Sequence, residues 1–148
     1  MDEIFARNVL YWGDEAQKII ASSHIAVFGL GGVGGFCAEA LARSGVGELT
    51  LVDFDKVSKS NINRQIIALN STVGMYKTEL FEIRLRDINP DIKLHLINDF
   101  YLEDFDFSGI NYTADAIDTM RSKVNLLVKC LENNVTAVSY THLTLPTT

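Results

Sequence analysis

The stretch that decides the fold begins at His24 and reads His-Ile-Ala-Val-Phe-Gly-Leu-Gly-Gly-Val-Gly-Gly. Its first part, from Ile25 to Phe28, is a short apolar run of strand-forming residues. The glycines follow at once and spell GxGGxG with Gly29, Gly31, Gly32 and Gly34. Because glycine lacks Cβ, it permits a tight turn and lets backbone N–H groups approach an anion. The stretch therefore predicts a strand that ends in a phosphate-binding turn.

A helix and a second strand are predicted directly after the glycines. The apolar residues of the helix recur at the spacing of one helical face. They are Val33, Phe36, Cys37, Ala40 and Leu41, and we expect them to pack on a sheet. The run from Leu49 to Val52 then predicts a buried strand, and Asp53 follows it. Asp53 stands about 20 residues beyond the glycines, the spacing at which an acid meets a ribose hydroxyl in a nucleotide-binding βαβ unit. The combination predicts a site for an adenine nucleotide.

Composition limits the chain to one domain. It has 148 residues, 47% of them hydrophobic, which suffices for one core but not for two. The net charge of -6 argues against sequence-independent wrapping of nucleic acid, although a local basic patch at Arg121, Lys123 and Lys129 stays open. Cys37 and Cys130 lack CxxC spacing, so both are expected to pack in the core. No apolar run approaches the ~20 residues of a membrane span and the start has no signal-peptide character, so we expect a cytoplasmic protein.

The segment after Asp53 is polar and too long for a hairpin turn. It leaves the carboxyl end of the second predicted strand, on the same edge of the sheet as the glycine turn. Open α/β sheets bind their ligands at that edge. We therefore expect its polar side chains to face the nucleotide phosphates, namely those of Asn61, Asn63, Arg64 and Gln65.

Two charged residues farther along the chain bear on this site, although Lys77 taken by itself could also be a solvated surface lysine. A helix is predicted from Tyr76 to Ile88, with Lys77 in its first turn, where the helix dipole disfavours a cation unless an anion holds it. A strand is predicted from Tyr112 to Ile117, and Asp118 stands at its carboxyl end. A carboxylate beside phosphates suggests Mg²⁺, which often bridges carboxylates to substrate phosphates.

The order of elements predicts an α/β, Rossmann-like fold with a mostly parallel sheet and helices on both faces. The other predicted elements are helices at 5–21, broken at Gly13, and at 121–133, and strands at 93–97 and 135–138. The buried face of the last helix is predicted to consist of Val124, Leu127, Val128 and Leu131. We expect the domain to occupy residues 1–138. Residues 139–148 look like a translated cloning sequence rather than native chain, so His142 receives no catalytic role.

The motifs of the chain resemble those of the E1-like, ubiquitin-activating or ThiF-type superfamily of ATP-dependent adenylating enzymes. They are Gly-Leu-Gly-Gly-Val-Gly, Leu-Val-Asp-Phe-Asp, Ser-Asn-Ile-Asn-Arg-Gln, Val-Gly-Met-Tyr-Lys and Asp-Ala-Ile-Asp-Thr, in that order. Within the superfamily the chain most resembles the tRNA threonylcarbamoyladenosine dehydratases. The carriers are Glu-Ala-Leu-Ala-Arg-Ser-Gly-Val-Gly, Asn-Arg-Gln-Ile-Ile-Ala-Leu and Ala-Ile-Asp-Thr-Met-Arg-Ser-Lys.

This resemblance implies a reaction and a set of site residues. The implied enzyme uses ATP and Mg²⁺ to adenylate the threonylcarbamoyl carboxylate of an adenosine beside the tRNA anticodon, and cyclisation follows with net loss of water. The implied nucleotide contacts are Gly29, Gly31, Gly32, Gly34, Asp53, Asp55, Asn61, Arg64, Gln65, Lys77 and Arg7. Catalysis is assigned to Arg64, Lys77 and Asp118, with Asp118 also holding the metal. Arg7 matches an arginine that reaches the phosphates of a neighbouring subunit, so a homodimer is implied.

Three alternatives stay open. The first is adenylation of the C-terminal glycine of a ubiquitin-like sulfur carrier, with a sulfur-relay protein as partner. The second is an NAD-dependent dehydrogenase, which shares the glycine turn and the spaced acid but leaves Lys77 and Asp118 without a role. The third is a nucleotide-binding fragment without catalysis. Members of the superfamily continue farther, so the chain is expected to be truncated at its C-terminus and to leave a sheet edge unpaired.

Overall fold

The computed structural model describes residues 3–100 and 102–140. In this part of the chain, five parallel strands form one sheet in the order β3-β2-β1-β4-β5. The strands are β1 (His24–Phe28), β2 (Glu48–Val52), β3 (Lys93–Ile97), β4 (Tyr112–Asp115) and β5 (Thr136–Ser139). The helices are α1 (Ala6–Ala21), α2 (Gly34–Ser44), α3 (Lys77–Ile88) and α4 (Met120–Glu132), with short 3-10 turns η1 (Glu3–Phe5) and η2 (Lys59–Asn61). The predicted Rossmann-like α/β fold is confirmed.

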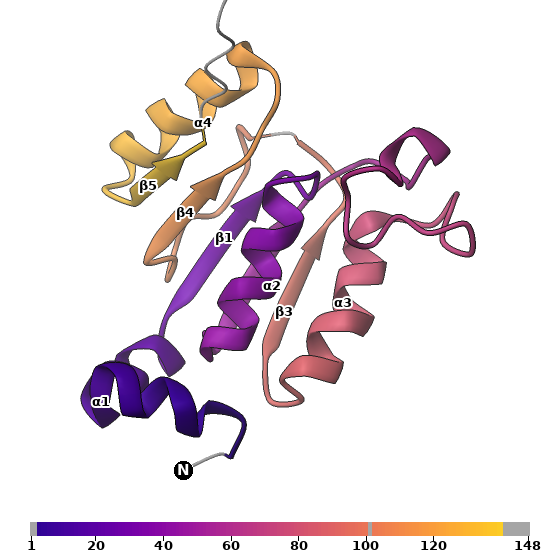
Figure 1. Ribbon diagram of the computed structural model, residues 1–148. Helices are drawn as coiled ribbons and strands as arrows, with labels where there is room; N and C mark the ends of the chain where they lie inside the picture. Colours follow the sequence, from indigo (N-terminus) through magenta and orange to yellow (C-terminus); the bar gives the residue numbers. More distant parts are fainter. Residues whose placement is uncertain (1–2, 101, 141–148) are drawn as a thin grey trace, which may run out of the picture.

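Helices cover both faces of the sheet, as predicted. α2 and α3 lie side by side over one face, and α4 packs against β4 and β5 on the other (Figure 1). The chain runs outward from β1 to β3 and then returns to β4 on the other side of β1. The carboxyl ends of β1 and β4 thus mark the point where the strand order reverses, which is where open α/β sheets bind ligands.

α1 lies near the amino ends of the strands, at the end of the sheet opposite the carboxyl ends of β1 and β4 (Figure 1). It is interrupted at Gly13, where φ is 87°, so the predicted break in this helix is confirmed. Within residues 3–100 and 102–140, no helix is both long and apolar enough to cross a membrane.

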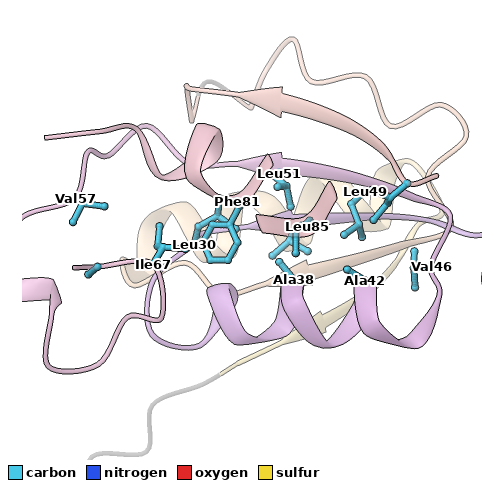
Figure 2. Packing of buried hydrophobic residues seen from close by; sticks show 13 residues of the cluster. Leu30, Ala38, Ala42, Val46, Leu49, Leu51, Val57, Ile67, Phe81 and Leu85 are labelled. Carbon is cyan, nitrogen blue, oxygen red and sulfur yellow. The ribbon is translucent and has the colours of Figure 1, made fainter. Parts of the chain in front are cut away.

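The main core lies between the sheet and the pair α2 and α3. Large side chains come from the strands and from α3, and small ones from α2 (Figure 2). Members that are completely inaccessible to solvent are Val27, Leu30, Ala38, Ala42, Leu49, Leu51, Phe81 and Leu85. The central strands β1 and β2 read as nearly continuous apolar runs because they are covered on both faces.

The buried face of α2 differs from the predicted stripe. Val33 and Phe36 are 39% and 53% exposed, and Cys37 is only half-buried. The inward face carries glycine and alanine instead. A Cβ on Gly35 would lie 2.8 Å from the Phe81 ring, so close packing of α2 requires small residues inside and turns the large ones outward.

The buried face of α4 also differs from the prediction. Leu126 and Cys130 face the sheet and are buried, which confirms the core position of Cys130, and burial raises the pKa of its thiol. Three residues of the predicted face, Val124, Val128 and Leu131, are 50%, 45% and 79% exposed. The apolar positions of α4 form an arc wider than one contact surface, and the sheet contacts only one side of that arc.

A charged cluster fastens α2 to α3. The Glu39 carboxylate accepts hydrogen bonds from Arg84 Nε at 2.7 Å and from Arg43 Nε at 3.0 Å. Its side chain is 10% exposed, whereas the two arginines are 40% and 58% exposed. The hydrogen bond from Arg84, and to a smaller extent the one from Arg43, holds the pKa of Glu39 below its ordinary value although burial acts in the opposite sense.

Candidate functional site

A cleft of about 390 Å³ opens at the carboxyl ends of β1, β2 and β4. It lies at the reversal of strand order, so topology and cavity indicate the same place. Most of the predicted site residues line it, namely Gly29, Gly31, Asp53, Asp55, Asn61, Arg64, Gln65, Lys77 and Asp118. Larger hollows exist elsewhere on the described chain, but this cleft is the one that gathers phosphate-binding chemistry.

The glycine turn forms one wall of the cleft. Gly29 has a φ of 92°, and a Cβ there would lie 2.6 Å from the carbonyl oxygen of Ala116. Gly34 does not line the cleft, and a Cβ on it would lie 1.6 Å from the Gly29 carbonyl oxygen. The absence of a side chain at Gly34 therefore serves the close packing of α2 on the turn. Gly31 lines the cleft, and a Cβ there would meet only Gln65 Nε2, at 3.6 Å.

Asp53 braces the glycine turn. Its Oδ2 accepts a 2.7 Å hydrogen bond from the Leu30 N–H, and its Oδ1 accepts one of 2.7 Å from the Asp55 N–H. The residue is 4% exposed, and burial raises the pKa of its carboxyl group despite these two bonds. Each oxygen keeps a second lone pair, so a further hydrogen bond from a hydroxyl remains compatible with this geometry.

Lys77 is the most unusual charge at the site. Its side chain is 5% exposed, and its Nζ lies 3.9 Å from Asp55 Oδ2. Within the described residues the ammonium group makes no shorter contact to an acceptor. A buried ammonium with one distant partner retains unused donors, and buried charges are normally paired. The lysine is therefore suited to bind an anion in the cleft.

The polar segment after β2 places three predicted residues in the cleft. Asn61 Oδ1 accepts a 2.9 Å hydrogen bond from the Ser58 N–H, which orders the turn η2. Arg64 is exposed and donates through Nη1 to the Ser60 carbonyl and to Asn63 Oδ1, each at 2.9 Å. Gln65 is 7% exposed, and its Oε1 is buried without a hydrogen-bond partner in the described structure. Buried acceptors normally have a donor, so this oxygen is an unsatisfied acceptor beside the cleft.

Asn63, Gly32 and Arg7 fall outside the residues that line the cleft. Asn63 acts on it through Arg64, as just described, and a Cβ on Gly32 would lie 3.6 Å from Arg64. Arg7 lies in α1, in a separate surface hollow with Arg43 and Arg84. Its predicted contact is to the phosphates of a neighbouring subunit, so that role stays a prediction.

Asp118 reaches the cleft from the loop after β4, and a buried ion pair supports that loop. Asp115 accepts hydrogen bonds from the Ile117 N–H at 3.0 Å and from Lys123 Nζ at 2.8 Å. Lys123 also donates to the Tyr140 carbonyl at 2.7 Å. Lys123 is only 6% exposed and is paired with Asp115, so it cannot belong to a basic surface patch. The patch of Arg121, Lys123 and Lys129 that the sequence left open is therefore not present as such.

Sequence reasoning missed the aromatic side chains at the cleft. Phe54 and Phe100 line it and stack edge to face, with ring centroids 4.9 Å apart. Thr119 and Ser122 add hydroxyl groups near Asp118. The positions of Phe54, next to Asp53, and of Phe100, just after β3, were the available signal, since both follow strands whose carboxyl ends meet at the site.

The parallel sheet, the reversal of strand order and the glycine turn define a Rossmann-like α/β domain with a candidate nucleotide cleft. The chain belongs to the ThiF family, whose sequence pattern it matches over residues 5–144. This confirms the resemblance to the ThiF-type superfamily.

Curated relatives and solved structures point the same way. The chain is 45% identical over 140 residues to tRNA threonylcarbamoyladenosine dehydratase of Bacillus subtilis, covering 91% of this chain and 55% of that protein. It is 40% identical in sequence to the crystal structure of E. coli tRNA N6-threonylcarbamoyladenosine dehydratase, TcdA, in complex with ATP. The TM-score is 0.88, with 93% of this chain and 58% of that chain covered. It is also 35% identical over 141 residues to molybdopterin-synthase adenylyltransferase of Escherichia coli, covering 93% of this chain and 55% of that protein. The chain thus spans about half the length of the curated relatives it matches.

Proposed function

We propose that this chain is the ATP-binding part of a tRNA threonylcarbamoyladenosine dehydratase, which uses ATP to cyclise N6-threonylcarbamoyladenosine in tRNA. The observation that carries the proposal is the buried Lys77 ammonium, 3.9 Å from its nearest carboxylate, in a cleft walled by the glycine turn. The relatives support the choice of substrate, because identity to the Bacillus subtilis dehydratase is 45% and to the molybdopterin-synthase adenylyltransferase of Escherichia coli 35%.

The residues of the cleft would position the phosphates and offset their charge. The glycine turn offers backbone N–H groups at the start of α2, where the helix dipole favours an anion. In the proposed step the substrate carboxylate attacks the α-phosphorus of ATP, a new C–O–P linkage forms, and pyrophosphate leaves. Lys77 and Arg64 would stabilise the charge that shifts onto the phosphate oxygens. Arg64 is held beforehand by Ser60 and Asn63.

The carboxylates at the mouth of the cleft fit a magnesium ion. Asp118 is exposed, and the side chain of Asp55 is 54% exposed, so both can reach a hydrated cation beside phosphates. Mg²⁺ prefers such oxygen ligands and commonly retains several waters. When bound, it would neutralise phosphate charge, and we assign its protein ligand to Asp118.

Three further expectations belong to this proposal. A homodimer would let Arg7 of one subunit approach the phosphates of the other. tRNA is the proposed substrate partner, and a sulfur-relay protein is the partner only under the sulfur-carrier alternative. An enzyme that acts on tRNA would work in the cytoplasm.

The test is to incubate the full chain with Mg-ATP and tRNA that carries threonylcarbamoyladenosine, and then to weigh the released nucleosides by mass spectrometry. The expected product is lighter by one water. Lys77→Ala should lose the product, whereas the exposed α1 variant Lys18→Ala should retain it, because the Lys18 side chain is 74% exposed and distant from the cleft.

Other results would select an alternative. Pyrophosphate release that depends on a ubiquitin-like carrier with a C-terminal glycine, and not on tRNA, would favour the sulfur-carrier adenylyltransferase. Binding of ATP without turnover on either substrate would identify a nucleotide-binding fragment. Oxidation or reduction of a bound nicotinamide would favour the dehydrogenase.

A further inference from the structure

A cluster of two histidines and a glutamate lies on the sheet, away from the nucleotide cleft. His24 begins β1, Glu48 begins β2 and His95 lies in β3. Parallel pairing sets His24 opposite Glu48 and Thr50 opposite His95, so these side chains share one face of the sheet. One ligand-type atom from each of His24, Glu48 and His95 lies within 4.8 Å of the others.

The distances within the cluster lie near those between two ligands of one metal ion. Glu48 Oε1 lies 2.7 Å from His95 Nε2 and 3.7 Å from His24 Nδ1. Two ligands on a tetrahedral zinc ion, each bonded at 2.0–2.1 Å, stand about 3.3 Å apart. The two observed distances fall on either side of this value. The His95 side chain is 53% exposed, so it has room to adjust around an ion.

Thr50 orients His24 toward the cluster. His24 Nε2 forms a 2.7 Å hydrogen bond with Thr50 Oγ1, and Thr50 is 4% exposed. With Nε2 engaged in this bond, Nδ1 points toward Glu48. Histidines that bind metals usually make such a bond through their second ring nitrogen, which sets the orientation and the tautomer of the ring.

The surroundings favour a cation. A hollow of about 730 Å³ adjoins the cluster, and its lining includes the carboxylates Asp99, Asp104 and Asp106. Carboxylates that line a hollow attract cations to it.

We propose that His24, Glu48 and His95 bind a divalent transition-metal ion such as Zn²⁺. Two imidazoles and one carboxylate suit zinc better than Mg²⁺ or Ca²⁺, which prefer oxygen ligands. The adjoining hollow leaves the fourth position to water. The site lies at the amino ends of β1 and β2, and at a rise of about 3.3 Å per residue His24 is about 17 Å along β1 from Gly29. It would therefore join three strands and stabilise the sheet, rather than take part in phosphate chemistry.

The test uses the full chain without a histidine tag, after removal of metal with a chelator. Calorimetric titration with ZnCl₂ is expected to show one saturable site, and MgCl₂ is expected to show none there. CoCl₂ should give the visible absorption of a low-coordinate Co²⁺ site with nitrogen ligands. Bound Zn²⁺ should also raise Tm.

Variants test whether these three side chains, rather than other groups of the chain, hold the zinc ion. His95→Ala removes an exposed ligand and should weaken zinc binding at least about tenfold, and Glu48→Gln should do the same. Thr50→Val keeps all three ligands but loses the orienting bond, and should weaken binding about tenfold to a hundredfold. The remaining histidine and the half-buried thiol provide matched controls, His142→Gln and Cys37→Ser, which should bind as the parent does.

The proposal is overturned if no saturable zinc site is found, or if both His95→Ala and Glu48→Gln bind as tightly as the parent. Loss of binding in Cys37→Ser or His142→Gln would also overturn it. ATP titration of His95→Ala distinguishes failure of the zinc proposal from failure of the proposed function. His95 lies outside the nucleotide cleft, so this variant should bind ATP as the parent does whether or not the dehydratase proposal holds.

Discussion

Two glycines of the same turn are expected to respond in opposite ways to alanine. A Cβ on Gly34 would lie 1.6 Å from the Gly29 carbonyl oxygen, far below the 3.0 Å that real contacts respect. The first turn of α2 would have to move by more than an ångström against a closely packed sheet. Overpacking typically costs about 1–3 kcal/mol, and more where the backbone must move, whereas alanine regains at most about 1 kcal/mol of helix propensity. We expect Gly34→Ala to lower the free energy of unfolding by about 3 kcal/mol, or Tm by about 10 °C.

Gly31→Ala should leave stability nearly unchanged and impair nucleotide binding. The added Cβ would meet only Gln65 Nε2, at an ordinary 3.6 Å, and the backbone at Gly31 does not require a positive φ. The methyl group would instead occupy the wall of the cleft where the phosphates must approach the backbone. We expect Tm within about 3 °C of the parent, and ATP affinity at least about tenfold lower, since the loss of close approach removes about 1.4 kcal/mol or more. Differential scanning calorimetry and ATP titration measure both. The reasoning is refuted if Gly34→Ala has the same Tm as the parent, or if Gly31→Ala binds ATP with the parent's affinity.

Three further predictions follow from the ion pairs and the cleft. Lys123→Ala leaves the buried Asp115 carboxylate without its ammonium partner and should lower the free energy of unfolding in urea by about 3–5 kcal/mol; a change under 1 kcal/mol would contradict the pairing. The pKa of Glu39 is lowered in the folded state. Its ionised form therefore adds to the free energy of unfolding above the ordinary pKa, and this stabilisation is lost as pH falls through the lowered value. Glu39→Gln should therefore be less stable than the parent by about 1–2 kcal/mol at pH 7, with the gap closing in acid, while Glu82→Gln on the exposed side of α3 changes little. Asp118→Asn should keep Tm, because the residue is exposed, and should lose the Mg²⁺ dependence of ATP binding; retained dependence would remove Asp118 from the metal site.

The strands and their parallel direction were predictable because short strand-forming runs alternate with helical patterns along the chain. The order β3-β2-β1-β4-β5 was not part of that prediction. The faces of the helices were not. In α2 and α4 several apolar positions compete for one contact surface, and only packing decides among them. Gly35 faces the core because Phe81 occupies the space that a larger side chain would need, a fact that no local pattern of α2 contains.

Most of the cleft was predictable for a topological reason. Residues that follow parallel strands gather at one edge, so Asp53 and Asp118 could be placed beside the glycine turn from the sequence alone. Lys77 begins a helix rather than following a strand, and only the resemblance to the ThiF-type superfamily assigned it to the same site. Contacts between residues far apart in the sequence could not be predicted in this way. A lysine in a helix, such as Lys123, is usually a surface residue, and only the fold brings it to the buried Asp115 carboxylate. The cluster at His24 likewise depends on the register of β1, β2 and β3, which the spacing of residues along the chain does not reveal.

The most direct test of the central claim is a calorimetric titration of the purified chain with Mg-ATP and, separately, with NAD, using Lys77→Met beside the parent. Methionine keeps the length of the buried side chain and removes its charge, so folding should be preserved, and replacing a buried charge in this way is often neutral or stabilising. The account predicts one ATP site in the parent, affinity at least about tenfold lower in Lys77→Met at an unchanged or higher Tm, and no comparable binding of NAD. Equal ATP affinity in the two proteins, or tighter binding of NAD than of ATP, would contradict it.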